Sequence, residues 1–396
     1  MAQYRAIFKN ANIAMLAAIA ASALAAGQAQ ATDRDWAAVD ETAAGDVLKA
    51  SGSALITNDK EFNITLDQAD NVLKSDNENN PVTFKADKGT ITVNGASAAL
   101  AIGTNNSGAT LVTLKGLNVT SGSVTISGKG ADANSSKLTA KQINVGGEST
   151  GTPDAATLTV NGHASVNAGT GAEEGFIVGK NGKVVIGNDQ AGQKAAVTGK
   201  IQINGGKVMF NGNSKDMAIL GSDQSTVVIA GGVVTNEAGK GGTIQGSSIT
   251  LSDSGKIETA HNIDIKAGNS GFNVQGGAIN VAENTTVAVT GNTKISAGNV
   301  TVSGGTNSGS MTVDGNLNLS GEGKIVLKHG ATQSGVLSVT GTTTATTGSN
   351  LSIESGSTAT FNGDASFAEG TLTAVKGSKI DLGTITANQT RPELLL

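Results

Sequence analysis

The feature that most constrains this chain is a rhythm of short, alternating apolar pairs. In its clearest run, Asn299–Lys328, the pairs are separated by Gly, Asn, Ser and Asp, and they are Val300/Val302, Met311/Val313, Leu317/Leu319 and Ile325/Leu327. Period-2 alternation is typical of a strand with one buried face, and Gly, Asn and Asp supply the left-handed backbone positions that end such strands. The run therefore predicts short strands joined by tight turns.

The same rhythm recurs from about Thr90 to Thr386. We expect an all-β chain whose strands wind into a right-handed parallel β-helix, a solenoid in which equivalent residues of successive coils lie about 4.8 Å apart. The segment from Val300 to Ile325 would span one turn of the coil. At roughly 20 to 25 residues per turn, the body would form about 12 to 15 coils in a rod on the order of 60 to 70 Å long.

An antiparallel β-meander is the rival architecture, because Asn-Gly and Asp-Gly dipeptides suit two-residue hairpins. They occur at Asn94, Asn161, Asn181, Asn204, Asn211, Asp314 and Asn362. The strand spacing is irregular, however, and a long sheet with one exposed face would need more charged outer positions than this sequence offers. The parallel coil is therefore favoured, and the insertions Gly146–Ala156 and Gly169–Gly175 are expected to bulge out as loops suited to recognition.

Composition excludes several other classes of protein. The 396 residues include 55 Gly but only 3 Pro, without the Gly-X-Y period of collagen, and many Val, Ile and Thr residues argue against disorder. The absence of Cys excludes disulfides, thiolate metal ligands and Cys nucleophiles. With a formal net charge of −5 and no cluster of basic residues, the chain is not expected to bind nucleic acid.

The N-terminus has the three parts of a Sec signal peptide over residues 1–31. These are a positive region with Arg5 and Lys9, an apolar stretch Ile13–Ala26, and the small-x-small cleavage site formed by Ala29 and Ala31, which makes Thr32 the first mature residue. An uncleaved membrane anchor is the alternative. The apolar stretch is about 14 residues, shorter than the roughly 20 that span a bilayer.

Residues 32–88 are expected to form an N-terminal cap and the first coils, followed by the β-helix body over 89–396. This region holds the single Trp, Trp36, and Asp35–Ala50 has the spacing of a short helix with Trp36, Val39, Val47 and Leu48 on one side. The acidic stretch Asp67–Glu78 lacks the spacing of an EF-hand or a calcium β-roll. We therefore interpret it as a solvated loop, not a calcium site.

No residue pattern predicts a catalytic, metal or cofactor site. Asp253, Glu258 and Asp264 lie within a dozen residues, and clustered acids on one face would be needed for polysaccharide cleavage, but scattered acids are ordinary on a soluble solenoid. The sequence Ser252–Gly255 faintly resembles the surroundings of a serine-protease nucleophile. The three histidines, His163, His261 and His329, are far apart. We therefore expect a protein that is not an enzyme.

The leader, the Cys-free body and coils such as Ile203–Asn213 and Val300–Gly321 resemble passenger domains of Gram-negative type V autotransporters and related large adhesins. The resemblance covers about residues 90–390 and implies a β-helix displayed at the cell surface. Such passengers are followed by an outer-membrane translocator barrel with aromatic girdles. This chain contains no barrel-like segment, so we expect it to be a fragment of a longer chain that carries the barrel, or a secreted passenger without its anchor.

The resemblance implies a function in adhesion, autoaggregation or biofilm formation, after export by the Sec pathway to the cell surface, the outer membrane or the medium. The expected partners are host or bacterial surface glycans or proteins, or further copies of the chain. No identified residue carries this function, since no Arg-Gly-Asp is present and Thr, Ser and Asn ladders are also needed for solubility. A polysaccharide-cleaving β-helix enzyme and a structural surface-layer or matrix protein remain the alternatives.

Overall fold

The computed structural model describes residues 33–40, 46–77, 80–104, 108–129, 135–147, 155–187, 194–212, 217–221, 226–367 and 369–384. Throughout these ranges the chain forms strands and turns and contains no helix. The expected signal peptide, with Ala29, Ala31 and Thr32, lies outside the described residues.

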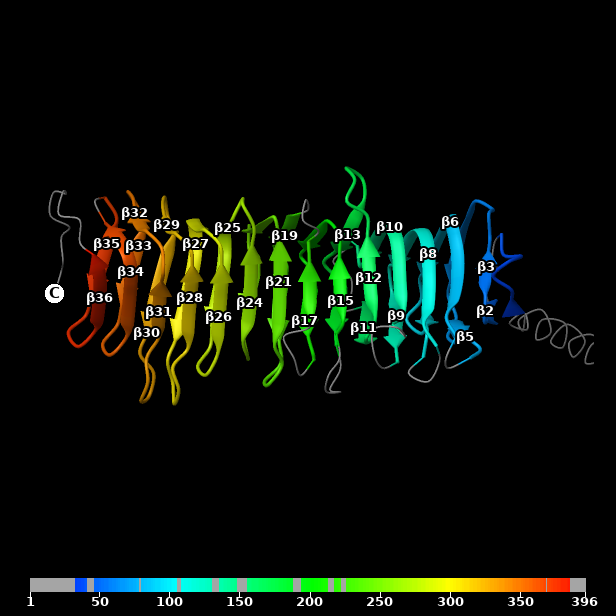
Figure 1. Ribbon diagram of the computed structural model, residues 1–396, viewed down its shortest axis with the longest axis horizontal. Helices are drawn as coiled ribbons and strands as arrows, with labels where there is room; N and C mark the ends of the chain where they lie inside the picture. Colours follow the sequence, from blue (N-terminus) through cyan, green and yellow to red (C-terminus); the bar gives the residue numbers. More distant parts are fainter. Residues whose placement is uncertain are drawn as a thin grey trace, which may run out of the picture.

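The strands wind into an elongated parallel solenoid, as the sequence predicts (Figure 1). Val300 pairs with Ile325 and Val302 with Leu327, so the predicted turn of the coil is confirmed. The solenoid makes about 12 turns. The ladders between named strands run parallel, which rules out the antiparallel meander, and antiparallel bridges such as Gly304–Ser308 and His329–Ser334 only close small hairpins.

Three sheets form the faces of the rod, and β1 (Asp33–Arg34) pairs with the first strand of face 1. Face 1 stacks β2 (Val47–Gly52), β5 (Asn71–Ser75), β7 (Ala99–Ile102), β9 (Gly122–Gly128), β11 (Ala156–Gly162), β14 (Gly182–Ile186), β17 (Lys207–Phe210), β20 (Val233–Asn236), β23 (Lys256–Glu258), the second parts of β25 (Phe272–Val281) and β27 (Thr293–Ser303), β30 (Lys324–Lys328), β33 (Asn350–Ile353) and β35 (Thr371–Ala374).

Face 2 follows face 1 in each coil, and face 3 completes the coil. Face 2 stacks β3 (Leu55–Thr57), the first parts of β6 (Val82–Val93), β8 (Thr110–Val119) and β10 (Lys137–Val145), then β12 (Ser165–Ala168), β15 (Ala196–Thr198), β18 (Ala218–Leu220), β21 (Gly242–Gly246), β24 (Ile263–Ala267), β26 (Thr286–Thr290), β28 (Ser310–Asp314), β31 (Val336–Val339), β34 (Thr358–Ser366) and β36 (Lys379–Thr384). Face 3 stacks β4 (Phe62–Leu66), the second parts of β6, β8 and β10, β13 (Gly175–Val178), β16 (Ile201–Asn204), β19 (Thr226–Ala230), β22 (Ser248–Ser252), the first parts of β25 and β27, β29 (Leu317–Leu319), β32 (Thr343–Ala345) and the end of β34.

The apolar pairs of the sequence point inward and stack from coil to coil. On face 1, one such column contains fully buried residues from nine successive coils: Leu158, Val184, Val208, Val234, Ile257, Ile279, Val300, Ile325 and Leu351. Burial of apolar side chains stabilises by about 1.5–3 kcal/mol each, so this spine is the main source of stability. The core column of face 3 is less regular: Thr293 and Thr343 occupy inward positions beside Phe272 and Leu317, and among the described residues their hydroxyls have no hydrogen-bond partner.

Two sequence predictions near the N-terminus are wrong. Residues 36–38 form a turn and Val47–Gly52 form β2, so the expected helix over Asp35–Ala50 is absent from its described part. The apolar residues are instead buried in the first coils: Trp36 is fully buried and packs edge-on against Phe62 and Phe84, with ring centroids 6.0 and 5.8 Å away. Tertiary packing and the parallel pairing of β2 with β5 outweigh the weak local helical spacing.

The acidic stretch Asp67–Glu78 is not one loop, because Asn71–Ser75 form β5 of face 1. Alternate residues of this strand, including Leu73, face the core, and Asp67, Asp70 and Asp76 lie outside the strand. The insertion Gly169–Gly175 does stand out of the stack between β12 and β13, as expected (Figure 1). Of the insertion Gly146–Ala156, residues 148–154 lie outside the described ranges.

Candidate functional site

The corner between face 2 and face 3 changes character along the rod. In the coils of β6, β8 and β10 the chain passes this corner without leaving the strand, with only a register shift between Ala86 and Thr90. Further along, separate strands meet there through short turns such as Gly291–Asn292 and Gly315–Asn316. The same corner therefore has two different surfaces on one scaffold.

Surface hollows follow this corner. An N-terminal hollow of about 460 Å³ is lined by Asp87, Thr113, Leu114, Thr139, Ala140, Lys141, Ala168 and Gly169. A second hollow, of about 260 Å³, is lined by Gly221, Gln245, Gly246, Ser247, Lys266, Ala267 and Gly268. A third, of about 280 Å³, is lined by Asn269, Ser270, Gly271, Asn273, Asn292, Thr293, Lys294, Asn316 and Asn318.

The second and third hollows lie on either side of one turn, since Gly268 of one precedes Asn269 of the other in the chain; we call them together the corner groove. The groove extends over the coils of β18, β21, β24, β26 and β28. Four steps of about 4.8 Å give it a length of about 20 Å along the rod axis. It lies at strand ends fixed by ladders on both faces, so its shape is set by the solenoid.

Glycine shapes the corner where the groove runs. Gly291 has φ +111°, a conformation that disfavours other residues, and a Cβ on it would overlap the carbonyl oxygen of Ala267 in the preceding coil. Gly315 is stacked on it in turn: a Cβ there would lie 2.5 Å from the Gly291 carbonyl oxygen. Without Cβ atoms the backbones of successive coils approach closely, and the side chains that follow, Asn292 and Asn316, come into line.

The corner asparagines are held by the next coil. Asn292 Oδ1 accepts a hydrogen bond from the backbone N–H of Asn316 (3.2 Å), and Asn316 Oδ1 accepts one from Thr342 N–H (2.8 Å). Within the described part of the chain, no hydrogen bond uses the NH2 groups of these two amides. The hydrogen bonds to the oxygens thus fix the two side chains, and their NH2 groups can donate hydrogen bonds to a ligand.

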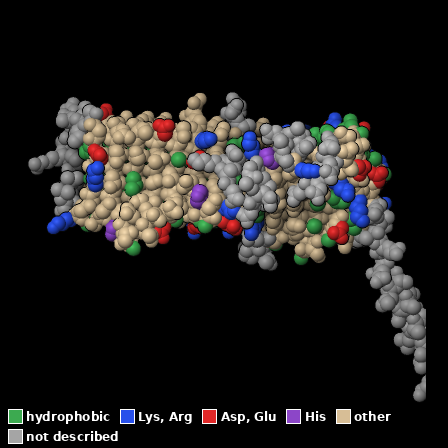
Figure 2. All heavy atoms as spheres, turned by 60° about the horizontal axis from the view of Figure 1, so that its bottom comes forward, with side chains coloured by type: hydrophobic (Ala, Val, Ile, Leu, Met, Phe, Trp, Pro, Cys, Tyr) green, Lys and Arg blue, Asp and Glu red, His purple; other side chains and the backbone are tan. Residues whose placement is uncertain are grey.

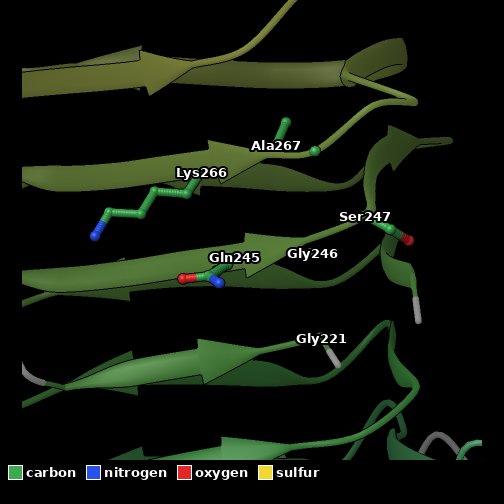
Figure 3. Close-up of a pocket in the computed structure, with 7 residues that line it drawn as sticks. Gly221, Gln245, Gly246, Ser247, Lys266 and Ala267 are labelled. Atoms are coloured by element: carbon green, nitrogen blue, oxygen red, sulfur yellow. The ribbon is translucent and has the colours of Figure 1, made fainter. Parts of the chain in front are cut away.

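The charge of the corner groove comes from two exposed lysines. Figure 3 shows Lys266 and Gln245 extending from neighbouring strands on the same side of the sheet, whereas Ser247 points away beyond the turn. Lys294 lies in the third hollow, between Asn273 and Asn318 in the face 3 ladder. In the described ranges neither ammonium forms an ion pair, and no carboxylate lines either hollow.

The acids considered for catalysis are not brought together. Asp253 lies in the turn between β22 and β23, with φ +53°, whereas Glu258 is in β23 on face 1 and Asp264 in β24 on face 2. Glu258 Oε1 lies 3.9 Å from Lys256 Nζ across an exposed surface. The Ser252–Gly255 segment is the end of β22 and a turn, in which Ser252 Oγ donates to Asp253 Oδ2 at 3.3 Å.

The histidines share one corner, between face 1 and face 2, but lie on different coils. His163 precedes β12, His261 precedes β24 and His329 precedes β31. At least three coil steps separate any two of them, or about 14 Å, too far to bind one metal ion. His329 Nδ1 instead lies 2.6 Å from Ser334 Oγ across its own hairpin. Among the residues described, no three His, Asp or Glu side chains come within reach of a common metal ion.

The corner groove is not among the features predicted from the sequence. Asn-Gly and Asp-Gly indicate turns, but the dipeptide that marks the groove is the reverse one, Gly-Asn, at Gly291–Asn292 and Gly315–Asn316, one coil apart. Figure 2 shows one face of the rod, on which polar side chains and backbone predominate and charges are scattered. A binding site on such a surface is recognised only when the side chains at one corner are compared from coil to coil.

Comparison with known proteins adds no argument about the fold or the function of this chain. No protein-family model matches the sequence, and no curated protein matches it. A crystal structure described as a TibC-catalyzed, hyper-glycosylated TibA fragment matches over 89% of this chain and 97% of that one, with 14% identity and a TM-score of 0.34. A similarity this low carries no conclusion about shared function.

Proposed function

We propose that the protein is an exported β-solenoid, displayed at the cell surface, that acts in adhesion, autoaggregation or biofilm formation. The observation that carries the proposal is the corner groove: polar recognition groups spread over successive coils along a rod instead of converging in one enclosed pocket. The sequence resemblance to autotransporter passengers and the leader-like N-terminus support the same reading. Where the structure describes the chain, no helix is long and apolar enough to cross a membrane.

A rod with distributed contacts gains strength by multivalency. Each coil offers only one or two amide or ammonium groups at the corner, so a single contact is weak. Many copies of the rod on one cell raise the effective concentration of the second and later contacts, and the combined strength exceeds that of any one contact by orders of magnitude. Attachment of cells, which present many copies at once, needs no tighter site.

Polysaccharide cleavage is the less favoured function. It requires two carboxyl groups flanking one bond, about 5–10 Å apart. Asp253, Glu258 and Asp264 lie on a corner and on two different faces. Incubation of the protein with a panel of polysaccharides tests this alternative: product release that disappears in Asp253→Ala would establish it against our proposal.

The test of adhesion compares cells that express the full-length protein with cells from which it is deleted. We expect faster sedimentation and more attachment to coated surfaces in the expressing cells, and loss of both after mild proteolysis of intact cells, which also tests surface exposure. Equal behaviour of the two strains would contradict the proposal. Ordered assembly of the purified protein without any ligand would favour the structural-layer alternative.

A further inference from the structure

We propose that the corner groove binds a polysaccharide that carries carboxylate groups, lying along the rod axis. This inference rests on the proposed adhesive function and gives it a ligand class and a site. The groove joins two hollows of about 260 and 280 Å³ and crosses the successive coils of β18 to β28. A ligand that fills it is extended and chain-like, not a compact small molecule.

The charge of the groove selects an anion. The chain as a whole is acidic, with 32 Asp and Glu against 27 Lys and Arg. Among the described residues, the lining of the groove contains Lys266 and Lys294 and no carboxylate. Some exposed lysines elsewhere on the rod pair with acids, as in Lys85 with Asp87 at 3.2 Å and Lys379 with Asp381 at 3.6 Å, whereas Lys324 and Lys328 of β30, like the groove lysines, form no ion pair within the described residues. Lys266 and Lys294, on adjacent coils, form no ion pair within the described residues, and their ammonium groups fit carboxylates supplied by a ligand.

The amides select hydroxyl groups between those charges. Five asparagines and Gln245 line the groove, and each amide presents both a donor and an acceptor, as a sugar hydroxyl does. Asn292 and Asn316 are held by their oxygens, so their NH2 groups face a ligand in a fixed position without the entropy cost of ordering them. An acidic peptide offers backbone amides and aliphatic side-chain stems instead of ring hydroxyls, and the lining contains no apolar side chain larger than Ala267 to pack on those stems.

The spacing favours a polymer over a single sugar. Lys266 is in β24 and Lys294 in β27, which lie in adjacent coils on opposite sides of the corner. The coil rise of about 4.8 Å is close to the advance of one pyranose ring along an extended chain, so successive sugar residues meet successive coils. Each coil then contributes one or two polar contacts, and the affinity grows with the number of coils that are occupied.

The test measures binding of the full-length purified protein to polygalacturonate, to the neutral polymer dextran and to poly-L-glutamate. We expect binding to polygalacturonate, weakened by salt, and an affinity for its oligomers that rises with length until the groove is spanned. The double variant Lys266→Gln/Lys294→Gln should lose on the order of tenfold in affinity. The matched control Lys324→Gln/Lys328→Gln removes two exposed lysines from β30 on face 1 and should stay within about twofold.

The outcomes separate the site from the function. Equal loss in the two double variants, binding of poly-L-glutamate as tight as that of polygalacturonate, or no binding to polygalacturonate would each overturn the proposal. If the groove variant no longer binds the polysaccharide but cells that display this variant still attach and aggregate, the protein is an adhesin that uses another ligand. The groove is then not the site of adhesion. If the wild-type protein binds polygalacturonate but cells with and without the protein attach and aggregate alike, the proposed binding site is supported and the proposed adhesive function is rejected.

Discussion

The two ends of the hollowed corner differ in how the backbone turns. In the coils of β6, β8 and β10, the strand runs through the corner, and the N-terminal hollow beside it is lined by Leu114, Ala140 and two residues of opposite charge, Asp87 and Lys141. In the coils of β24 to β29, glycine turns replace the continuous strand, and the corner groove is lined by amides and two lysines. One solenoid thus carries an ordinary surface at one end and a candidate binding surface further along.

The difference also reaches the interior. In one inward column of face 3, the N-terminal coils carry Ile64, Ile91, Leu117 and Ile143. The coils beside the groove carry Val227, Ile249, Phe272, Thr293 and Leu317, and the coil after them carries Thr343. Because each coil contacts only its neighbours, such substitutions are tolerated locally without unfolding the rod. The lesson is that corner chemistry in a solenoid can change while the parallel ladders stay the same.

Of the substitutions that test the difference between the two ends of the corner, Gly291→Ala is expected to change the free energy of unfolding most. The backbone at Gly291 has φ +111°, and the new methyl group would meet the Ala267 carbonyl, so we expect a loss of about 2–4 kcal/mol in the free energy of unfolding. Denaturant unfolding of the purified protein, with hydrogen exchange to locate the change, measures it. Protection should fall around β24 and β26 and persist in the N-terminal coils.

The matched control is Gly116→Ala at the same corner in β8. Gly116 has ordinary φ, and its Cβ would lie 3.3 Å from the Thr90 methyl group, a contact that a side chain can relieve. We expect a change within about 1 kcal/mol. Equal losses at the two glycines would show that the continuous strand and the glycine turn impose the same constraint, contrary to the comparison.

A smaller effect of opposite sign is expected from Thr343→Val. Thr343 is fully buried and its hydroxyl has no partner, so replacing it with a methyl group of similar shape should raise the free energy of unfolding by about 1 kcal/mol. Thermal unfolding measures the gain. The neighbouring outward residue provides the control, because Thr344→Val adds apolar surface to solvent and should give no gain. A destabilised Thr343→Val protein would mean that the hydroxyl is satisfied by a water molecule.

The fold was predictable because the alternating apolar pairs that form its core are visible in the sequence itself. Val300/Val302 and Ile325/Leu327 are alternating and separated by one turn, and the structure stacks them directly. The helix over Asp35–Ala50 was wrong because Trp36 is buried by contacts with Phe62 and Phe84, which are distant in the sequence. The groove could not be predicted for a related reason: Lys266 and Lys294 are placed in adjacent coils on either side of one corner only once the number of residues in each coil is known.

The smallest effect concerns how asparagines are used at the two ends of the corner. In the N-terminal coils, Asn144 Nδ2 donates to Asn118 Oδ1 at 2.8 Å, so the two amides bind each other across face 3. Asn318, at the equivalent ladder position beside the groove, forms no such bond within the described residues. We expect Asn144→Ala to lower the free energy of unfolding by about 0.5–1 kcal/mol and Asn318→Ala to leave it unchanged while weakening polygalacturonate binding. Parallel unfolding and binding measurements on both variants decide the matter. The reverse pattern would assign the structural amides to the groove and leave the N-terminal amides as the ones available to a ligand.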